Sequence, residues 1–140
     1  MVWKFKCPLK AKKKIWFLLS DKALTWDVIV RKGRDGPGRC YLCKLDVESN
    51  HHLSVACPFT QSVWLNLEDK LRINNLWNRE SVSDCLKTWC LNLEVKHIKS
   101  LPIIALWFIW KARNLSYFED ILLTPSQVST FSLGLLRSFR

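Results

Sequence analysis

Three cysteines and two histidines lie within one short polar stretch, CYLCKLDVESNHHLSVAC, at residues 40–57. Cys40 and Cys43 form a C-x2-C pair, a spacing at which one tight turn can direct two thiolates at a single ion. A histidine pair and Cys57 complete a set of sulfur and nitrogen ligands, which are the ligands that Zn²⁺ prefers. The stretch therefore predicts a tetrahedral Cys3His zinc site.

The path of the chain between His52 and Cys57 decides whether both can reach one ion. On a continuous helix these two side chains would point roughly 140° apart. Pro58 disfavours the helical conformation of the residue before it, so we expect Cys57 to be extended. A one-turn helix carrying His52, followed by a bend, would then present Cys57 to the metal. Spacing alone leaves His51 as a rival ligand.

A Cys3His set would make this a structural zinc site. Three thiolates and one imidazole fill the four positions of Zn²⁺ and leave one net negative charge, whereas a catalytic zinc keeps a water molecule. A disulfide or a group of unliganded thiols are the alternatives. The intracellular setting expected for this chain argues against the first, and the polar surroundings argue against the second. Cys7, Cys85 and Cys90 have no histidine at ligand spacing and are expected to be core thiols.

Length and composition favour a single folded domain. The chain has 140 residues, of which 49% are apolar and eight are tryptophan, so it can bury a core without depending on a metal. The apolar run 101–110 has ten residues, about half of the roughly 20 needed to cross a bilayer. The N-terminus lacks the apolar region of a secretory signal. We therefore expect an intracellular protein with no membrane partner.

The net charge of +10 is concentrated in the N-terminal arm: residues 1–39 carry +8, residues 40–75 carry −1 and residues 76–140 carry +3. Six lysines fall within eleven residues, namely Lys4, Lys6, Lys10, Lys12, Lys13 and Lys14. Such an imbalance suggests a polyanionic partner, with RNA or DNA held through its phosphates as the first candidate. A solvated helix face is the alternative for the lysines, and core packing is the alternative to base stacking for Trp3, Trp16 and Trp26.

The apolar residues recur at helical spacing almost throughout, and no strand pattern is evident, which predicts an all-α fold. Helices are expected over 10–20, 25–30, 58–71, 101–114 and from Thr124 onward, and one more, capped by Ser83, within 74–97. We expect a basic arm plus zinc motif over residues 1–75, with the zinc core at 36–64, and a tryptophan-rich helical extension over 76–140 packed on it as one domain.

Two of the C-terminal helices have predicted apolar stripes, and a third is apolar all round. The helix capped by Ser83 would bury Leu86, Trp89, Cys90 and Leu93. The last helix begins with the capping box TPSQ, residues 124–127, and would bury Val128, Phe131, Leu135 and Phe139. The segment LPIIALWFIWKARN, residues 101–114, is apolar on every side for nearly three turns, as is typical of a buried helix.

The stretch GPGRCYLCKLDVESNHHLSVACPFTQSVW, residues 36–64, resembles the zinc-binding domain that follows the polymerase of plant LINE-type reverse transcriptases. That family shows a C-x2-C pair, then Glu-Ser/Thr-x-x-His-Leu, then Cys-Pro-Phe and a tryptophan. The matching positions are Cys40, Cys43, Glu48, Ser49, His52, Leu53, Cys57, Pro58, Phe59 and Trp64. The resemblance implies His52, and not His51, as the zinc ligand. It departs at Lys13 and Lys14, where relatives carry apolar residues.

The resemblance implies a zinc-stabilised nucleic-acid-binding module that holds template RNA or target DNA and is not an enzyme. A nuclear location would suit it. One alternative is a protein-interaction module that docks through the apolar 101–110 helix, with Trp107 and Trp110 exposed to a polymerase or ribonuclease H domain. A second alternative is a retroelement fragment without a selected activity.

Overall fold

The computed structural model describes residues 40–45, 49, 51–73, 77 and 81–138. The elements in chain order are a short π-helix η2 (His52–Ala56), α3 (Pro58–Leu71), α4 (Val82–Leu91), a 3₁₀-helix η3 (Leu93–Ile98), α5 (Leu101–Glu119) and α6 (Pro125–Ser138). Every regular element in these ranges is helical, which confirms the all-α prediction for the described part. The helices expected over 10–20 and 25–30 lie outside it.

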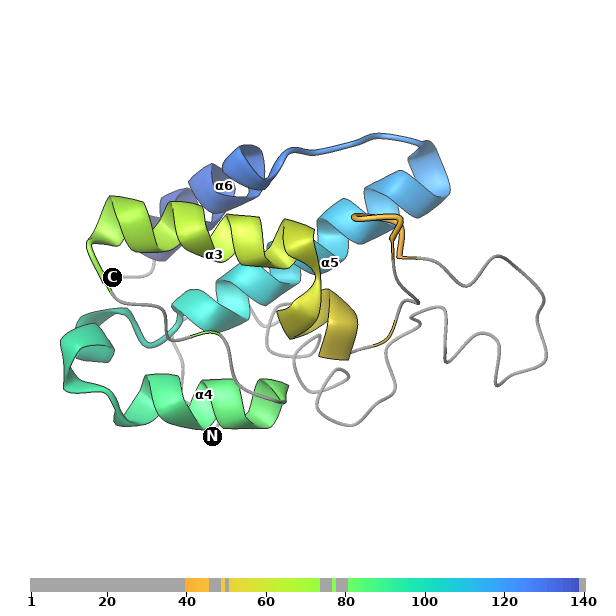
Figure 1. The fold of residues 1–140 in the computed structure, drawn as a ribbon. Helices are drawn as coiled ribbons and strands as arrows, with labels where there is room; N and C mark the ends of the chain where they lie inside the picture. The colour runs from red at the N-terminus through yellow and green to blue at the C-terminus, as the bar shows by residue number, and fades with distance from the viewer. Residues whose placement is uncertain (1–39, 46–48, 50, 74–76, 78–80, 139–140) are drawn as a thin grey trace.

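Helices α3, α5 and α6 pack together. Helix α6 contacts both α3 and α5. In Figure 1, α3 and α6 run in the same direction and α5 runs the opposite way, with α6 above α5 and α4 below it. One buried hydrophobic cluster extends from Cys40 to Leu136, so the zinc motif and the C-terminal helices share a core.

Local signals set the ends of these helices. Pro58 occupies the first turn of α3, and Arg72 ends the helix in the left-handed conformation, at φ 55°. At the start of α6 the predicted capping box is present: the Gln127 N–H donates to Thr124 Oγ1 at 3.1 Å, and the Thr124 N–H donates to Gln127 Oε1 at 2.8 Å. In α4 the prediction of Ser83 as the cap was wrong. Ser81 caps the helix by accepting from the Asp84 N–H at 3.1 Å.

Tryptophans fill the space between α3, α4 and α5. Trp64 stacks on Trp77, with ring centroids 5.0 Å apart, and lies 5.4 Å from Trp89. All three are buried, and the Trp89 Nε1–H donates to the Ile98 carbonyl at 3.2 Å. The first six residues of α5 are also buried, which confirms that this apolar helix serves the core. Among the described residues, no helix combines the length and apolarity that membrane crossing requires.

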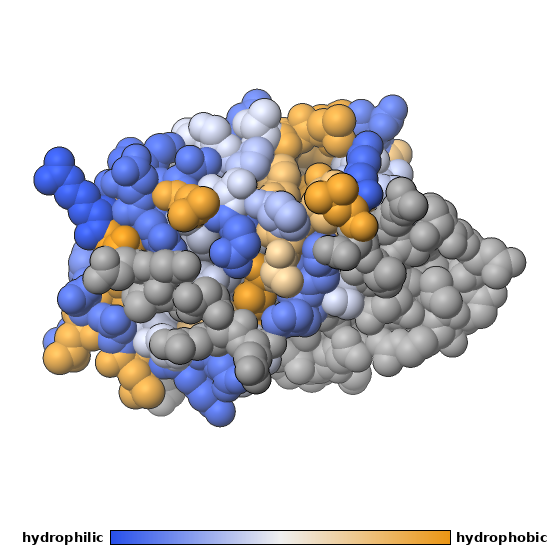
Figure 2. Space-filling model, viewed as in Figure 1, coloured by the Kyte–Doolittle hydropathy of each residue, from blue (hydrophilic) through white to orange (hydrophobic). Residues whose placement is uncertain are grey.

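The buried faces of α6 and of the α4–η3 corner differ from their predicted stripes. Helix α6 buries Val128, Ser129, Ser132, Leu133 and Leu136. Phe131, predicted as core, is 45% exposed, and Leu93 is 84% exposed. Figure 2 shows apolar atoms on the surface at lower left, where α4 ends and η3 begins. The physical reason in α6 is its contact with two helices, which places the small serines at the crossing.

Candidate metal centre

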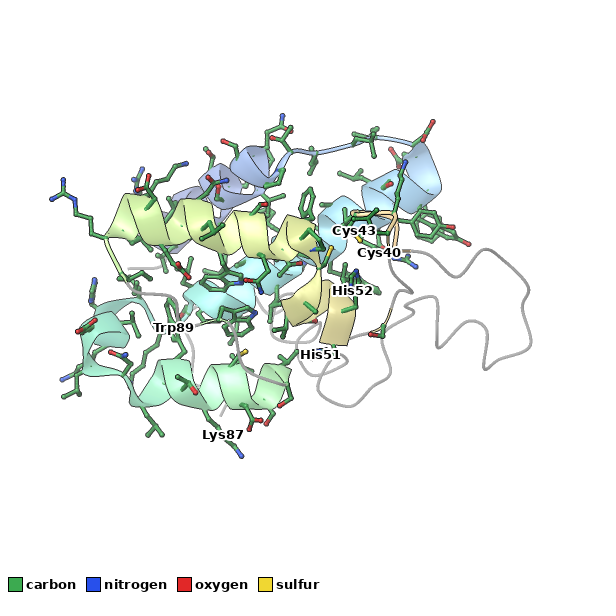
Figure 3. All side chains as sticks on the ribbon, in the orientation of Figure 1. Cys40, Cys43, His51, His52, Lys87 and Trp89 are labelled. Carbon is green, nitrogen blue, oxygen red and sulfur yellow. The ribbon has the colours of Figure 1, made fainter. Side chains whose placement is uncertain are left out.

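Cys40, Cys43, His52 and Cys57 come together in the folded chain. Their ligand atoms all lie within 4.8 Å of one another. Cys40, His52 and Cys57 are buried, and Cys43 is part-exposed. In Figure 3 His52 lies beside Cys40 and Cys43, whereas the exposed His51 lies apart from them. The structure therefore selects His52 over His51.

The ligand separations fit a tetrahedral zinc ion. With Zn–S bonds of about 2.3 Å and Zn–N bonds of about 2.0 Å, tetrahedral ligands lie about 3.8 Å apart for two sulfurs and about 3.5 Å apart for sulfur and nitrogen. The Cys40 and Cys57 Sγ atoms are 3.8 Å apart. Cys43 Sγ and His52 Nε2 are 3.3 Å apart. The donor set suits Zn²⁺, and these two separations are close to those of a tetrahedral site.

Backbone N–H groups point at the first two sulfurs. The Leu42 N–H donates to Cys40 Sγ at 3.4 Å, and the Leu45 N–H donates to Cys43 Sγ at 3.5 Å. The turn closes with a hydrogen bond from the Lys44 N–H to the Cys40 carbonyl at 2.9 Å, and Lys44 is left-handed, at φ 61°. Hydrogen bonds of this kind stabilise thiolates, which are the form that binds metal.

In the metal-free chain the Cys40 and Cys57 sulfurs share a proton. The hydrogen bond with Cys57 lowers the pKa of Cys40 to about 5, because the thiolate is the acceptor. The same hydrogen bond, together with burial, raises the pKa of Cys57. At neutral pH the proton therefore resides on Cys57, and a metal ion must displace it.

The His52–Cys57 segment takes the predicted shape. The π-helix η2 ends at Ala56, and the next residue, Cys57, has a φ of −59° and a ψ of 131°, which are extended as expected before Pro58. The Ser49 hydroxyl accepts from the His52 N–H at 3.0 Å, which starts this short helix. This role of Ser49 follows the usual capping chemistry of serine one turn before a helix, but ligand spacing did not reveal it.

Side chains from outside η2 satisfy its free carbonyls. The Thr60 hydroxyl donates to the Leu53 carbonyl, and the Gln61 amide donates to the Val55 carbonyl. The Trp77 Nε1–H donates to the Ser54 carbonyl at 2.8 Å. These three residues position the histidine ligand, and the sequence carries no signal that would have identified Trp77.

The other candidate residues lie elsewhere. Cys85 is buried in the core, as predicted, and burial raises the pKa of the half-buried Cys90. Trp110 is only 4% exposed, which argues against its direct contact with a partner. Trp107 is half-buried beneath Lys111, whose Nζ is 4.1 Å from the ring centroid. The lysines of the basic arm, Lys4 to Lys14, and Cys7 lie outside the described residues.

Comparison with models of known protein families gives a match. Residues 1–64 match the model of the family described as zinc-binding in reverse transcriptase. No curated protein and no solved structure matches the chain. The matched segment contains all four ligands and the six lysines of the arm. The match over residues 1–64 is consistent with a reverse transcriptase zinc-binding domain, and the cluster of Cys40, Cys43, His52 and Cys57 supports one structural zinc ion.

Proposed function

We propose that this chain is a zinc-stabilised nucleic-acid-binding module of a LINE-type reverse transcriptase. In that setting it would hold template RNA or target DNA against the polymerase. The observation that carries the proposal is the union, within residues 1–64, of a closed Cys3His site and six clustered lysines. The LINE-type and plant assignments rest on the likeness of residues 36–64 described above.

The two features would have separate tasks. The zinc ion has no open coordination position, so its task is to order the chain around it and not to perform a reaction. The lysines would contact phosphates, which position a nucleic acid without reading its sequence. A nuclear location fits this role, and the same lysine cluster would suit nuclear import.

A salt titration of oligonucleotide binding tests the proposal. Fluorescent single-stranded and double-stranded oligonucleotides are titrated with the zinc-loaded protein at several salt concentrations. If the arm contacts phosphates, each lost contact flattens the log–log slope by about 0.7–0.9. Replacement of Lys10, Lys12, Lys13 and Lys14 with Gln should therefore flatten the slope by about three. It should also lower the affinity for oligonucleotides of every sequence by a similar factor.

The matched control removes the same charge elsewhere. Lys70, Lys87, Lys96 and Lys99 are exposed on α3, α4, η3 and the turn after η3. Figure 3 shows Lys87 extending from α4 away from the other helices. The variant with these four lysines changed to Gln should keep the wild-type slope. Equal slopes for both variants would mean that binding follows net charge alone, and the arm would have no special role.

The alternative of a protein-docking module placed the docking surface on the 101–110 helix, most of which is buried. Residues 101–106, Ile109 and Trp110 are buried in this chain's own core. Among the described residues, the most exposed large apolar side chains are instead Leu91 and Leu93, at 83% and 84%. The zinc-ligand cluster and the six lysines both lie within the matched segment, so the nucleic-acid proposal is the better supported.

A further inference from the structure

The turn that carries the first two zinc ligands lies against α5, a helix outside the matched segment. The Ser116 hydroxyl donates to the Tyr41 carbonyl at 3.2 Å, across 75 residues of sequence. The Tyr41 ring meets the Tyr117 ring edge-on, with centroids 4.9 Å apart. Tyr41 thus has backbone and side-chain contacts with the C-terminal half of α5.

A buried arginine completes these contacts. Arg113 is 1% exposed, and its guanidinium carbon lies 5.3 Å from the Tyr41 ring centroid and 4.9 Å from that of Tyr117. Its Nη1 donates to the neighbouring Asn114 Oδ1 at 3.1 Å. Cation–π contacts are stronger when they are shielded from water, as this one is. The Tyr41 ring is therefore held between α5 side chains.

The geometry connects Ser116 to the metal site through one peptide group. The Tyr41 carbonyl and the Leu42 N–H belong to the same planar peptide. The Ser116 hydroxyl donates to the oxygen of this peptide, the Tyr41 carbonyl. The N–H of the same peptide, which belongs to Leu42, donates to Cys40 Sγ at 3.4 Å. Hydrogen bonds in a chain polarise one another, so the bond at the oxygen strengthens the N–H as a donor. The orientation of the Tyr41–Leu42 peptide and its polarisation both stabilise the thiolate form of Cys40 over the thiol.

We propose that α5 completes the zinc site: Ser116 is a positioning residue that orients the Tyr41–Leu42 peptide toward Cys40 Sγ, while Arg113 and Tyr117 hold the Tyr41 ring in place. Residues outside a metal's ligands commonly act on it in this way, by fixing the ligands' orientation. The zinc affinity of this chain then depends on a helix that begins 37 residues after the family match ends. This inference concerns zinc alone and does not depend on nucleic-acid binding.

The test compares Ser116→Ala with Ser132→Ala in the full chain. Ser132 is also a buried serine, and its hydroxyl donates to the Val128 carbonyl at 2.7 Å within α6. Zinc affinity is measured by competition with a chromogenic chelator, and stability by thermal unfolding of the metal-free proteins. Ser116→Ala should weaken zinc binding by about fivefold, the usual effect of one hydrogen bond, and Ser132→Ala should not.

Cobalt substitution separates positioning from a general loss of stability. The thiolate-to-cobalt charge-transfer band reports the electron density on the sulfurs. In Ser116→Ala the Leu42 N–H is less polarised and is a weaker donor to Cys40 Sγ, so this band should move to longer wavelength. In Ser132→Ala the band should be unchanged. An unchanged band together with wild-type zinc affinity in Ser116→Ala would overturn the proposal for Ser116.

The ring contacts are tested by Arg113→Met against Lys111→Met. Both changes remove a cation from an aromatic ring on α5, but Lys111 lies over Trp107 and not over Tyr41. Only Arg113→Met should weaken zinc binding. Because loss of a buried arginine can prevent folding, Tyr117→Leu provides a second variant with the same expected direction. Wild-type affinity in Tyr117→Leu would refute the role of the Tyr41 ring contacts.

Discussion

At the scale of single residues, the four zinc ligands differ in their access to water. Cys40, His52 and Cys57 are buried, and only Cys43 is part-exposed. A competing chelator or an oxidant therefore meets Cys43 first. Cys40 and Cys57 are protected from direct attack, which suits a metal that is retained for structure.

The choice between the two adjacent histidines is directly testable. His52→Ala removes a ligand. It should lower zinc affinity by more than the roughly 10–100-fold that is typical when a hydrogen-bond partner of a ligand is removed. His51→Ala should leave affinity unchanged, because His51 is exposed and outside the ligand cluster. Chelator competition measures both. A larger loss in His51→Ala than in His52→Ala would contradict the ligand assignment.

Zinc binding should release protons, because protons and zinc compete for the same sulfurs. Cys57, with its raised pKa, holds a proton at neutral pH, whereas Cys40, with a pKa of about 5, does not. Zinc therefore displaces at least the Cys57 proton, and affinity should fall as the pH falls, more steeply below about pH 5 where Cys40 also takes up a proton.

Calorimetric titration of the metal-free chain in buffers of different ionisation enthalpy measures this proton release. The control is a titration of calcium, which has little affinity for thiolates. A zinc affinity that does not change between pH 5 and neutral pH would contradict the pKa directions assigned to the sulfur pair.

At the scale of elements, neither ligand-bearing segment is self-sufficient. The η2 helix has five residues, and its free carbonyls accept hydrogen bonds from Thr60, Gln61 and Trp77. A helix this short is not stable alone in water. The start of α3, immediately after Cys57, is therefore a structural support for the histidine ligand.

This support predicts a stability difference between two threonines. Thr60→Val keeps the shape of the side chain but leaves the Leu53 carbonyl without its donor, at a cost of about 1–3 kcal/mol. Thr130→Val on the exposed face of α6 removes a hydrogen bond to the Ser126 carbonyl and should cost less than about 0.5 kcal/mol. Chemical denaturation of the zinc-loaded proteins gives both values. Equal losses would show that Thr60 is not a special support of η2.

At the scale of the whole molecule, the metal and the helical core stabilise different parts of one structure. Zinc joins two segments that are separated in sequence, whereas α6 packs on α3 and α5 through side chains that need no metal. The shared cluster from Cys40 to Leu136 connects the two parts. Loss of zinc should therefore begin as a local event.

Chelation of zinc should lower the thermal midpoint and remove hydrogen-exchange protection first from residues 40–61. The free energy of metal binding is the free energy of local folding there. Amides of α6 should keep most of their protection, because α6 packs mainly on α3 and α5. Exchange measured by mass spectrometry before and after chelation checks this order. A uniform loss across the chain would mean that zinc and core fold as one unit.

Features encoded by neighbouring residues could be predicted from the sequence. Cysteine spacing and the break imposed by Pro58 predicted the ligand cluster, because both act over a few residues. The Thr124–Gln127 capping box predicted the start of α6 for the same reason, and Pro58 predicted the start of α3. The choice of His52 came from the family resemblance, since spacing alone left His51 open.

Contacts between distant segments were decided only by the tertiary structure. Ser116 meets Tyr41 across 75 residues, and Trp77 meets Ser54 across 23, because helix packing brings them together and no local pattern records it. In α6 the apolar Phe131 is 45% exposed while Ser129 and Ser132 are buried. Their hydroxyls donate within their own helix, at 3.1 Å and 2.7 Å, so the small side chains can be buried where α6 packs on α3 and α5. Hydrophobic periodicity could not predict this, because it ranks side chains by polarity, whereas helix packing selects them also by size.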